Sequence, residues 1–201
     1  MSEINLSKLA NYDFIVMIDT SGSMEDTVKE GSDVTRWEHV QETAIQFSRD
    51  LSKIDSDGIG LVTFGGNIES FDGVNADKVK EVFASLAPRG TTPLAEALLE
   101  ALKLANKSDK KDFIVCFTDG VPDNRKAAEA VIRDAANAIE TDDALTILFI
   151  QIGDDARATA YLKQLDDDLK GAKFDIVDTK TIEEAGKFRS TSELILYAME
   201  N

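Results

Sequence analysis

The stretch Phe14-Ile15-Val16-Met17-Ile18-Asp19-Thr20-Ser21-Gly22-Ser23-Met24 decides the fold of this 201-residue chain. Its first five residues are all apolar, a run that is too short for a helix and typical of a strand covered on both faces. The run ends in an acid and two hydroxyl residues at alternating positions, Asp19, Ser21 and Ser23, and Gly22 permits a tight turn between the serines. Because Mg²⁺ prefers oxygen ligands, this stretch predicts one half of a cation site.

Two later segments supply matching oxygen groups. The apolar run at residues 113–117 ends in Thr118, Asp119 and Gly120, and the segment Gly90-Thr91-Thr92-Pro93 places a hydroxyl just before a helical pattern. An isolated Asp-x-Ser-x-Ser sequence is also common as a capped turn after a strand. The three segments together favour a metal site over that simpler interpretation.

Taken together, these segments resemble the metal-ion-dependent adhesion site of von Willebrand factor type A domains, and the resemblance extends over nearly the whole chain. It implies that Asp19, Ser21, Ser23, Thr92 and Asp119 hold Mg²⁺, with Mn²⁺ or Ca²⁺ as alternatives. The hydroxyls would contact the ion, and the two carboxylates would neutralise it, partly through waters. The resemblance further implies that a Glu or Asp of a partner protein completes the coordination, so that the domain is a protein–protein interaction module.

Short apolar runs alternate with amphipathic stretches along the chain. Strands are expected at residues 14–18, 59–64, 68–71, 113–118, 145–152 and 174–177, with helices between most of them. This alternation predicts an α/β fold with a doubly wound, mostly parallel sheet and helices on both faces. Ligands of such sheets bind beyond the carboxyl ends of the strands where the strand order reverses. The resemblance implies a Rossmann-like, six-stranded sheet in the order 3-2-1-4-5-6 with strand 3 antiparallel, in agreement with a hairpin turn at residues 65–67.

Local signals predict where several helices begin. Thr35 followed by Glu38 predicts a capping box, and Asn75 predicts the cap of a later helix. Thr92 followed by Pro93 predicts that the threonine caps the next helix, with the proline as its first residue. Apart from one narrow polar stripe that helix consists of Leu and Ala, so we expect it to be deeply packed.

Composition limits the classes of function. The chain has 38 acidic and 22 basic residues and a net charge of −16, which argues against a nucleic-acid or anionic membrane partner because phosphates would be repelled. The polar lead at residues 1–12 lacks a signal-peptide pattern, and no apolar run reaches the ~18 residues of a membrane helix. We therefore expect a cytoplasmic protein, monomeric alone, whose residues 1–201 form one domain. Its single cysteine, Cys116, lies in an apolar run and is expected to be a buried structural thiol.

Two other functions stay open at this level. By resemblance, the domain could be a subunit of an assembly driven by an AAA+ ATPase, or of a tellurite- or stress-resistance system. The same oxygen groups could also serve a Mg²⁺-dependent phosphoesterase. A hydrolytic site would need a base, for which Asp123 and Glu25 are the acids near in sequence, whereas the single histidine, His39, is expected at the surface. Since the sequence also lacks a Ser-His-Asp set and a phosphate-binding loop, we predict a binding module without catalytic activity.

Overall fold

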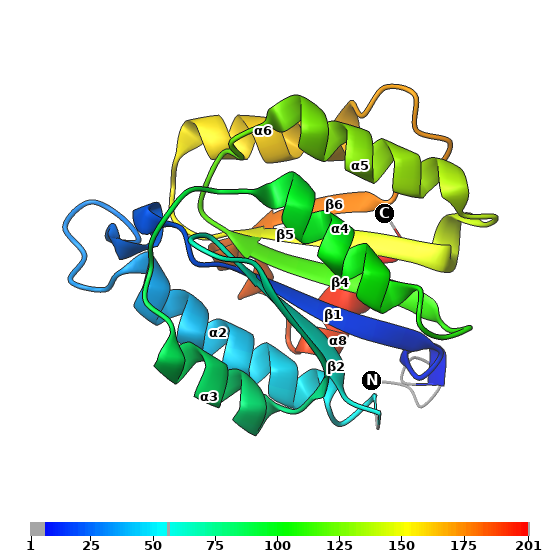
Figure 1. Cartoon of the computed structure of the whole chain (residues 1–201), viewed down its shortest axis with the longest axis horizontal. Coiled ribbons are helices and arrows are strands. Elements are labelled where there is room, and N and C mark those ends of the chain that lie inside the picture. The colour runs from blue at the N-terminus through cyan, green and yellow to red at the C-terminus, as the bar shows by residue number, and fades with distance from the viewer. Residues whose placement is uncertain (1–6, 56, 201) are drawn as a thin grey trace.

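A six-stranded sheet forms the centre of the computed structural model, which describes residues 7–55 and 57–200 (Figure 1). Five strands run parallel to one another: β1 (Tyr12–Asp19), β2 (Ile59–Phe64), β4 (Lys111–Thr118), β5 (Leu145–Gln151) and β6 (Val177–Thr181). The sixth, β3 (Glu69–Val74), pairs antiparallel with β2 at one edge of the sheet. The order β3-β2-β1-β4-β5-β6 confirms the predicted topology and the predicted hairpin.

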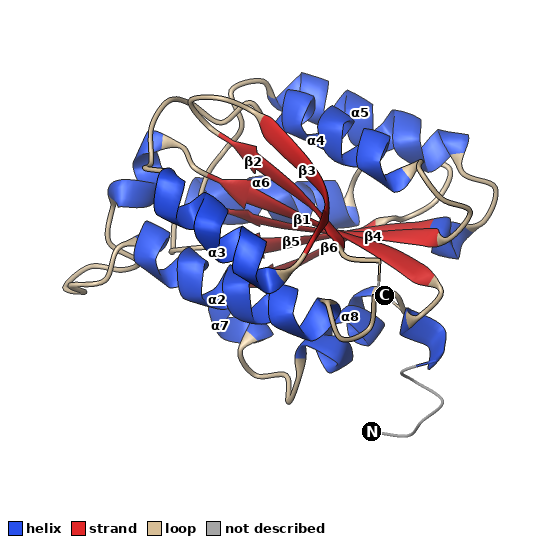
Figure 2. Cartoon of the chain, turned by 60° about the horizontal axis from the view of Figure 1, so that its bottom comes forward, coloured by secondary structure: helices blue, strands red, loops and turns tan. Residues whose placement is uncertain are grey.

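Helices cover both faces of this sheet (Figure 2). One face carries α2 (Arg36–Leu51), α3 (Ala76–Ser85), α7 (Ile182–Ala185) and α8 (Thr191–Ala198). The opposite face carries α4 (Leu94–Ala105), α5 (Arg125–Ala138) and α6 (Ala156–Asp167). Two short 3₁₀ helices, η1 (Gly22–Glu25) and η2 (Asp142–Ala144), precede α2 and β5.

Each helical layer buries its own apolar core against the sheet. Val16 and Phe117 belong to the core under α2, whereas Ile15 and Cys116 belong to the core under α4, α5 and α6. The alternation follows from the two-residue period of side chains along a strand, and it explains why the central strands are apolar throughout. Cys116 is fully buried, as predicted, and burial raises the pKa of its thiol.

Two of the three predicted helix starts are confirmed. Thr35 and Glu38 form the capping box of α2, and the Asn75 side chain caps α3. The third prediction is wrong, because α4 begins at Leu94 and its N-cap is Pro93, with φ −76° and ψ 61°. The Thr92 hydroxyl therefore does not cap this helix.

Two further expectations differ from the structure. The last strand is Val177–Thr181 and not residues 174–177, because its β-branched threonines extend an edge strand whose outward positions tolerate polar side chains. Helix α4 is not packed on all of its apolar positions, since Leu99 leaves 48% of its surface exposed. None of the described helices has the length and apolar character that crossing a membrane requires. Of the polar lead expected at residues 1–12, residues 1–6 lie outside the described residues, while Leu9 is buried.

Candidate metal centre

The carboxyl ends of β1 and β4 meet where the strand order reverses. β1 lies between β2 and β4, and the chain leaves β1 toward one face of the sheet and approaches β4 from the other. Asp19 is the last residue of β1 and Asp119 directly follows β4. Their exposed fractions are 0% and 1%, so two buried carboxylates lie at the position where doubly wound sheets bind ligands.

A chain of hydrogen bonds joins the oxygen groups of the two loops. The hydroxyl oxygens of Ser21 and Ser23 are 3.2 Å apart, and Ser23 Oγ donates to Asp119 Oδ1 at 3.1 Å. Asp19 Oδ1 accepts the Ser21 amide hydrogen at 2.8 Å, and Asp19 Oδ2 accepts the Thr118 hydroxyl hydrogen at 2.7 Å. Four of the five predicted residues thus share one network. Thr118 is a further member of this network that was not predicted from the sequence.

Thr92 approaches this network from a third segment. It is 7% exposed, its amide donates to Asp123 Oδ1 at 3.1 Å, and its carbonyl accepts from the Asp123 amide at 3.0 Å. Its hydroxyl lies against the loop that follows β4, where a Cβ added to Gly120 would be 3.7 Å from Thr92 Oγ1. Thr92 is therefore anchored beside Asp119, and its contact with a shared metal stays a prediction.

Close backbone approaches hold the three segments together. The Gly22 amide donates to the Gly90 carbonyl at 3.1 Å. Gly90 has a φ of +80°, and a Cβ at this residue would lie 2.7 Å from the backbone of Gly66. A Cβ at Gly65 would lie 2.5 Å from the Thr20 hydroxyl. Glycine is thus required at positions 65 and 90 for the segment that carries Thr92 to pack against the β1 loop.

The buried carboxylates make the site electrostatically unbalanced. Burial, and to a smaller extent the Asp119 carboxylate, raise the pKa of Asp19 from 3.8 to about 7. The hydrogen bonds from Thr118 and Ser21 oppose this rise and do not cancel it. A cation between the two carboxylates would remove the smaller, repulsive contribution to this rise and would favour the ionised form of Asp19.

Arg36 supplies a counter-charge that was not predicted from the sequence. Its Nη1 lies 2.6 Å from Oδ2 of Asp119 and 3.7 Å from Oδ2 of Asp26, and its side chain is 13% exposed. Asp119 therefore gives one oxygen to Arg36 and the other to Ser23. A signal was present in the sequence: Arg36 follows the cap Thr35 directly, and a positive charge at a helix N-terminus opposes the macrodipole unless acids lie nearby.

The donor set fits a hard cation. Within the part of the chain that the structure describes, no group of three or more His, Cys, Asp and Glu side chains could hold a metal ion. The candidate site instead combines two carboxylates with neutral hydroxyls, which suits Mg²⁺ better than a metal that prefers nitrogen or sulfur. Ser23 is exposed while the other four residues are buried, so the site opens to solvent at Ser23.

Fold and site together define a Rossmann-like domain that gathers hydroxyl and carboxylate groups at its switch point. The model of the von Willebrand factor type A domain family matches residues 14–121, more than half of the chain, and the chain belongs to this family. No curated protein matches the sequence.

Solved structures share this fold at low sequence identity. The vWF domain of the type V pili tip protein Mfa5 from Porphyromonas gingivalis is 14% identical with a TM-score of 0.60, over 94% of this chain and 96% of that one. A D319A mutant of the PilB minor pilin from Streptococcus sanguinis is 13% identical with a TM-score of 0.65 over 94% of this chain, which spans 61% of the pilin chain. The manganese-loaded TRAP protein from Plasmodium vivax is 19% identical with a TM-score of 0.58, over 88% of this chain and 71% of the TRAP chain.

Proposed function

We propose that this domain binds a partner protein through a divalent cation, Mg²⁺ in the first place, held by Asp19, Ser21, Ser23, Thr92 and Asp119. The observation that carries the proposal is the hydrogen-bonded chain from Ser21 through Ser23 to Asp119, beside a second buried carboxylate. It brings two hydroxyls and two acids from opposite halves of the sequence to one opening at the switch point.

The acidic residues and the hydroxyl residues have different roles in the proposed site. Asp19 and Asp119 supply the negative charge that balances a divalent ion, whereas the hydroxyls are neutral donors. When bound, the ion supplies an electrophilic centre that attracts one carboxylate, a Glu or Asp of the partner. Because the chain has a net charge of −16, an acidic partner is repelled at long range and needs this local attraction. The exposed Ser23 marks the side on which the partner approaches.

Arg36 acts in this scheme as a positioning residue for Asp119. It binds Oδ2 and leaves Oδ1 directed toward Ser23. The guanidinium also offsets part of the negative charge of the site while a cation is absent. We propose that Arg36 keeps the metal-free site folded at the cost of some metal affinity.

The arrangement favours binding over hydrolysis. Asp123, the candidate base, accepts the Thr92 amide hydrogen and so stabilises the loop that carries this threonine. His39 lies on α2 beside Glu42 and Phe188, in a hollow under α7 and α8 that is separate from the five residues of the site. A role in an ATPase-driven or stress-resistance assembly, a monomeric state and work in the cytoplasm stay predictions from the sequence, as does the assignment of residues 1–201 to one domain.

Substitution of single hydroxyls tests the proposal. Ser21→Ala and Thr92→Ala each remove one neutral oxygen, so we expect Mg²⁺ or Mn²⁺ affinity, measured by calorimetric titration, to fall about tenfold with little change in melting temperature. Ser85→Ala is the matched control, because Ser85 ends α3 and donates to the Val82 carbonyl away from the site. Unchanged titrations in both site variants would refute the assignment.

A further inference from the structure

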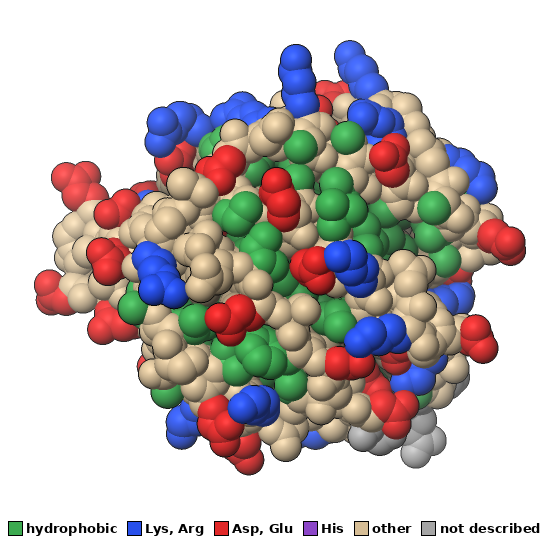
Figure 3. Space-filling view, viewed as in Figure 1, with side chains coloured by type: hydrophobic (Ala, Val, Ile, Leu, Met, Phe, Trp, Pro, Cys, Tyr) green, Lys and Arg blue, Asp and Glu red, His purple; other side chains and the backbone are tan. Residues whose placement is uncertain are grey.

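An apolar groove lies between α4 and α5 at the opposite end of the sheet from the candidate metal centre. Its volume is about 290 Å³, and Leu99, Leu102, Val131, Ala135 and Leu145 supply much of its lining. Figure 3 shows apolar side chains gathered over α4 and along its border with α5. The 48% exposure of Leu99 marks this surface as the part of α4 that the fold leaves uncovered.

A carboxylate with one unpartnered, buried oxygen contributes to this apolar lining. Asp112, the second residue of β4, contributes to the groove, and among the described residues its buried Oδ1 has no hydrogen-bond partner. Burial, and then the carboxylate of Asp13, raise the pKa of Asp112 to about 7. A buried polar atom that lacks a partner is unfavourable and would gain from a hydrogen-bond donor.

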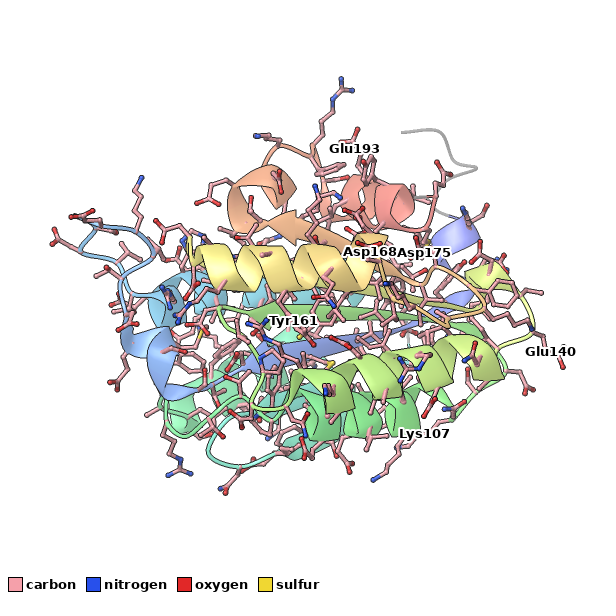
Figure 4. The ribbon with its side chains drawn as sticks, turned by 90° about the horizontal axis from the view of Figure 1, so that it is seen from above. Lys107, Glu140, Tyr161, Asp168, Asp175 and Glu193 are labelled. Carbon is pink, nitrogen blue, oxygen red and sulfur yellow. The ribbon has the colours of Figure 1, made fainter. Side chains whose placement is uncertain are left out.

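The neighbouring cations are engaged elsewhere. Lys110 Nζ pairs with Asp13 Oδ1 at 2.9 Å and also contacts Asp55 and Asp57. Lys107, at the end of the molecule where Figure 4 also labels Glu140, pairs with Asp72 at 2.7 Å. None of the described residues that line the groove is Lys, Arg or His.

Other groups make the groove more negative. Asp134, an exposed residue of α5, also lines it. Both helices end beside the groove, where Ala105 closes α4 and Ala138 closes α5. Helix carboxyl ends carry partial negative charge, so backbone and side chains together favour a positive group.

From this complementarity we propose that the groove is a docking site for a partner protein that inserts a Lys or Arg flanked by apolar residues. The aliphatic stem of such a side chain packs against Leu102 and Val131 while its charged end reaches Asp112. This contact is independent of the candidate metal centre. The groove would bind a positively charged side chain of the partner, whereas the proposed metal centre would bind a negatively charged one. The partner class is therefore a basic, amphipathic segment.

A pair of short peptides tests the inference. Acetyl-Leu-Lys-Leu-amide and its norleucine counterpart differ in one charge and are titrated into the ¹⁵N-labelled full chain with EDTA present, so that the metal proposal does not affect the result. We expect saturable shifts of backbone amides around the groove with the lysine peptide, and binding about tenfold weaker with the norleucine peptide. Equal affinities of the two peptides would overturn the inference, whether or not any variant folds.

Variants and a small amine identify the groups responsible. Asp112→Asn should reduce the lysine peptide to the affinity of the norleucine peptide, whereas Asp168→Asn, which removes an exposed charge labelled in Figure 4, should change nothing. Leu99→Ser should weaken the binding of both peptides. Butylammonium that binds as tightly as the lysine peptide would mean that the groove holds a small amine, and the docking inference would then be wrong.

Discussion

Replacing Arg36 with glutamine should destabilise the metal-free protein and strengthen its affinity for Mg²⁺. The substitution removes the ion pair of 2.6 Å with Asp119, whose side chain is 0% exposed, while Arg36 itself is 13% exposed. Breaking a buried pair costs about 3–5 kcal/mol, and an exposed pair contributes about 0–1 kcal/mol. Arg36 Nε is buried without a partner among the described residues, which offsets part of the stabilisation that the ion pair provides. We therefore expect the substitution to lower the free energy of unfolding by about 2 kcal/mol.

This free energy predicts two measurable changes. In a domain of this size about 2 kcal/mol lowers the melting temperature by roughly 4–8 °C, which differential scanning calorimetry in EDTA resolves. If a bound cation takes over the neutralisation of Asp119, the metal-bound variant loses little, and the Kd for Mg²⁺ falls at least tenfold. Mg²⁺ at 100 times its Kd then stabilises the folded variant by about 2.7 kcal/mol, which is enough to offset the stability lost with the ion pair.

Arg49→Gln provides the matched control. Arg49 lies exposed on the same helix, so the variant makes the same change in net charge away from the site. It should shift neither the metal-free melting temperature nor the Kd. Two results would contradict the reasoning: an unchanged melting temperature in the Arg36 variant, or weaker Mg²⁺ binding, which would mean that Arg36 belongs to the metal-bound site.

Four other substitutions test the charges and a helix cap. Asp19→Asn should raise the metal-free stability, by about 1–2 kcal/mol in urea unfolding at pH 8, because it removes a buried charge, whereas Asp119→Asn should lower it by breaking an ion pair. The pKa of Asp112 rises from 3.8 to about 7, so the folded state holds a proton that the unfolded chain releases, and stability falls as pH rises between these values. Asp112→Asn should therefore add about 1–2 kcal/mol at pH 8, discounted for partial exposure, and almost nothing at pH 4. Thr35→Ala should cost about 1 kcal/mol at either pH because it removes the N-cap of α2.

Short-range patterns were sufficient to predict the fold class and most of the strands, whereas the full strand order was predicted from the family resemblance. The central strands are buried on both faces, so their apolar runs are visible without knowledge of their neighbours. Asp19 ends β1 and Asp119 directly follows β4. The reversal rule for doubly wound sheets then places the two acids together. The error at the last strand has the same origin, because an edge strand with Asp178 and Lys180 gives no continuous apolar run.

Residues that act through distant contacts could not be predicted in this way. Arg36 and Asp119 are separated by 83 positions, and their pairing depends on how the start of α2 lies above the sheet. The misplaced start of α4 has a related cause: the Thr92 backbone is held by Asp123, so tertiary contacts outweigh the local capping signal. Leu99 lines a groove between α4 and α5, a relation between two helices that no periodicity along one helix reveals.

Helix α4 connects the two proposed contacts. It begins two residues after Thr92, and its last turn lies in the groove near Asp112. A helix of 12 residues is about 18 Å long, and at an effective dielectric constant of about 20 two unit charges at that separation interact by only about 1 kcal/mol. A charge at one end therefore acts only weakly at the other, so the proposed metal centre would attract an acid while the proposed groove contact would attract a base. A chain with a net charge of −16 can in this way select for two opposite charges, provided that each contact is short-ranged and local. Any coupling between the two ends would have to pass through a displacement of α4 against the sheet, since direct electrostatics are too weak at this distance.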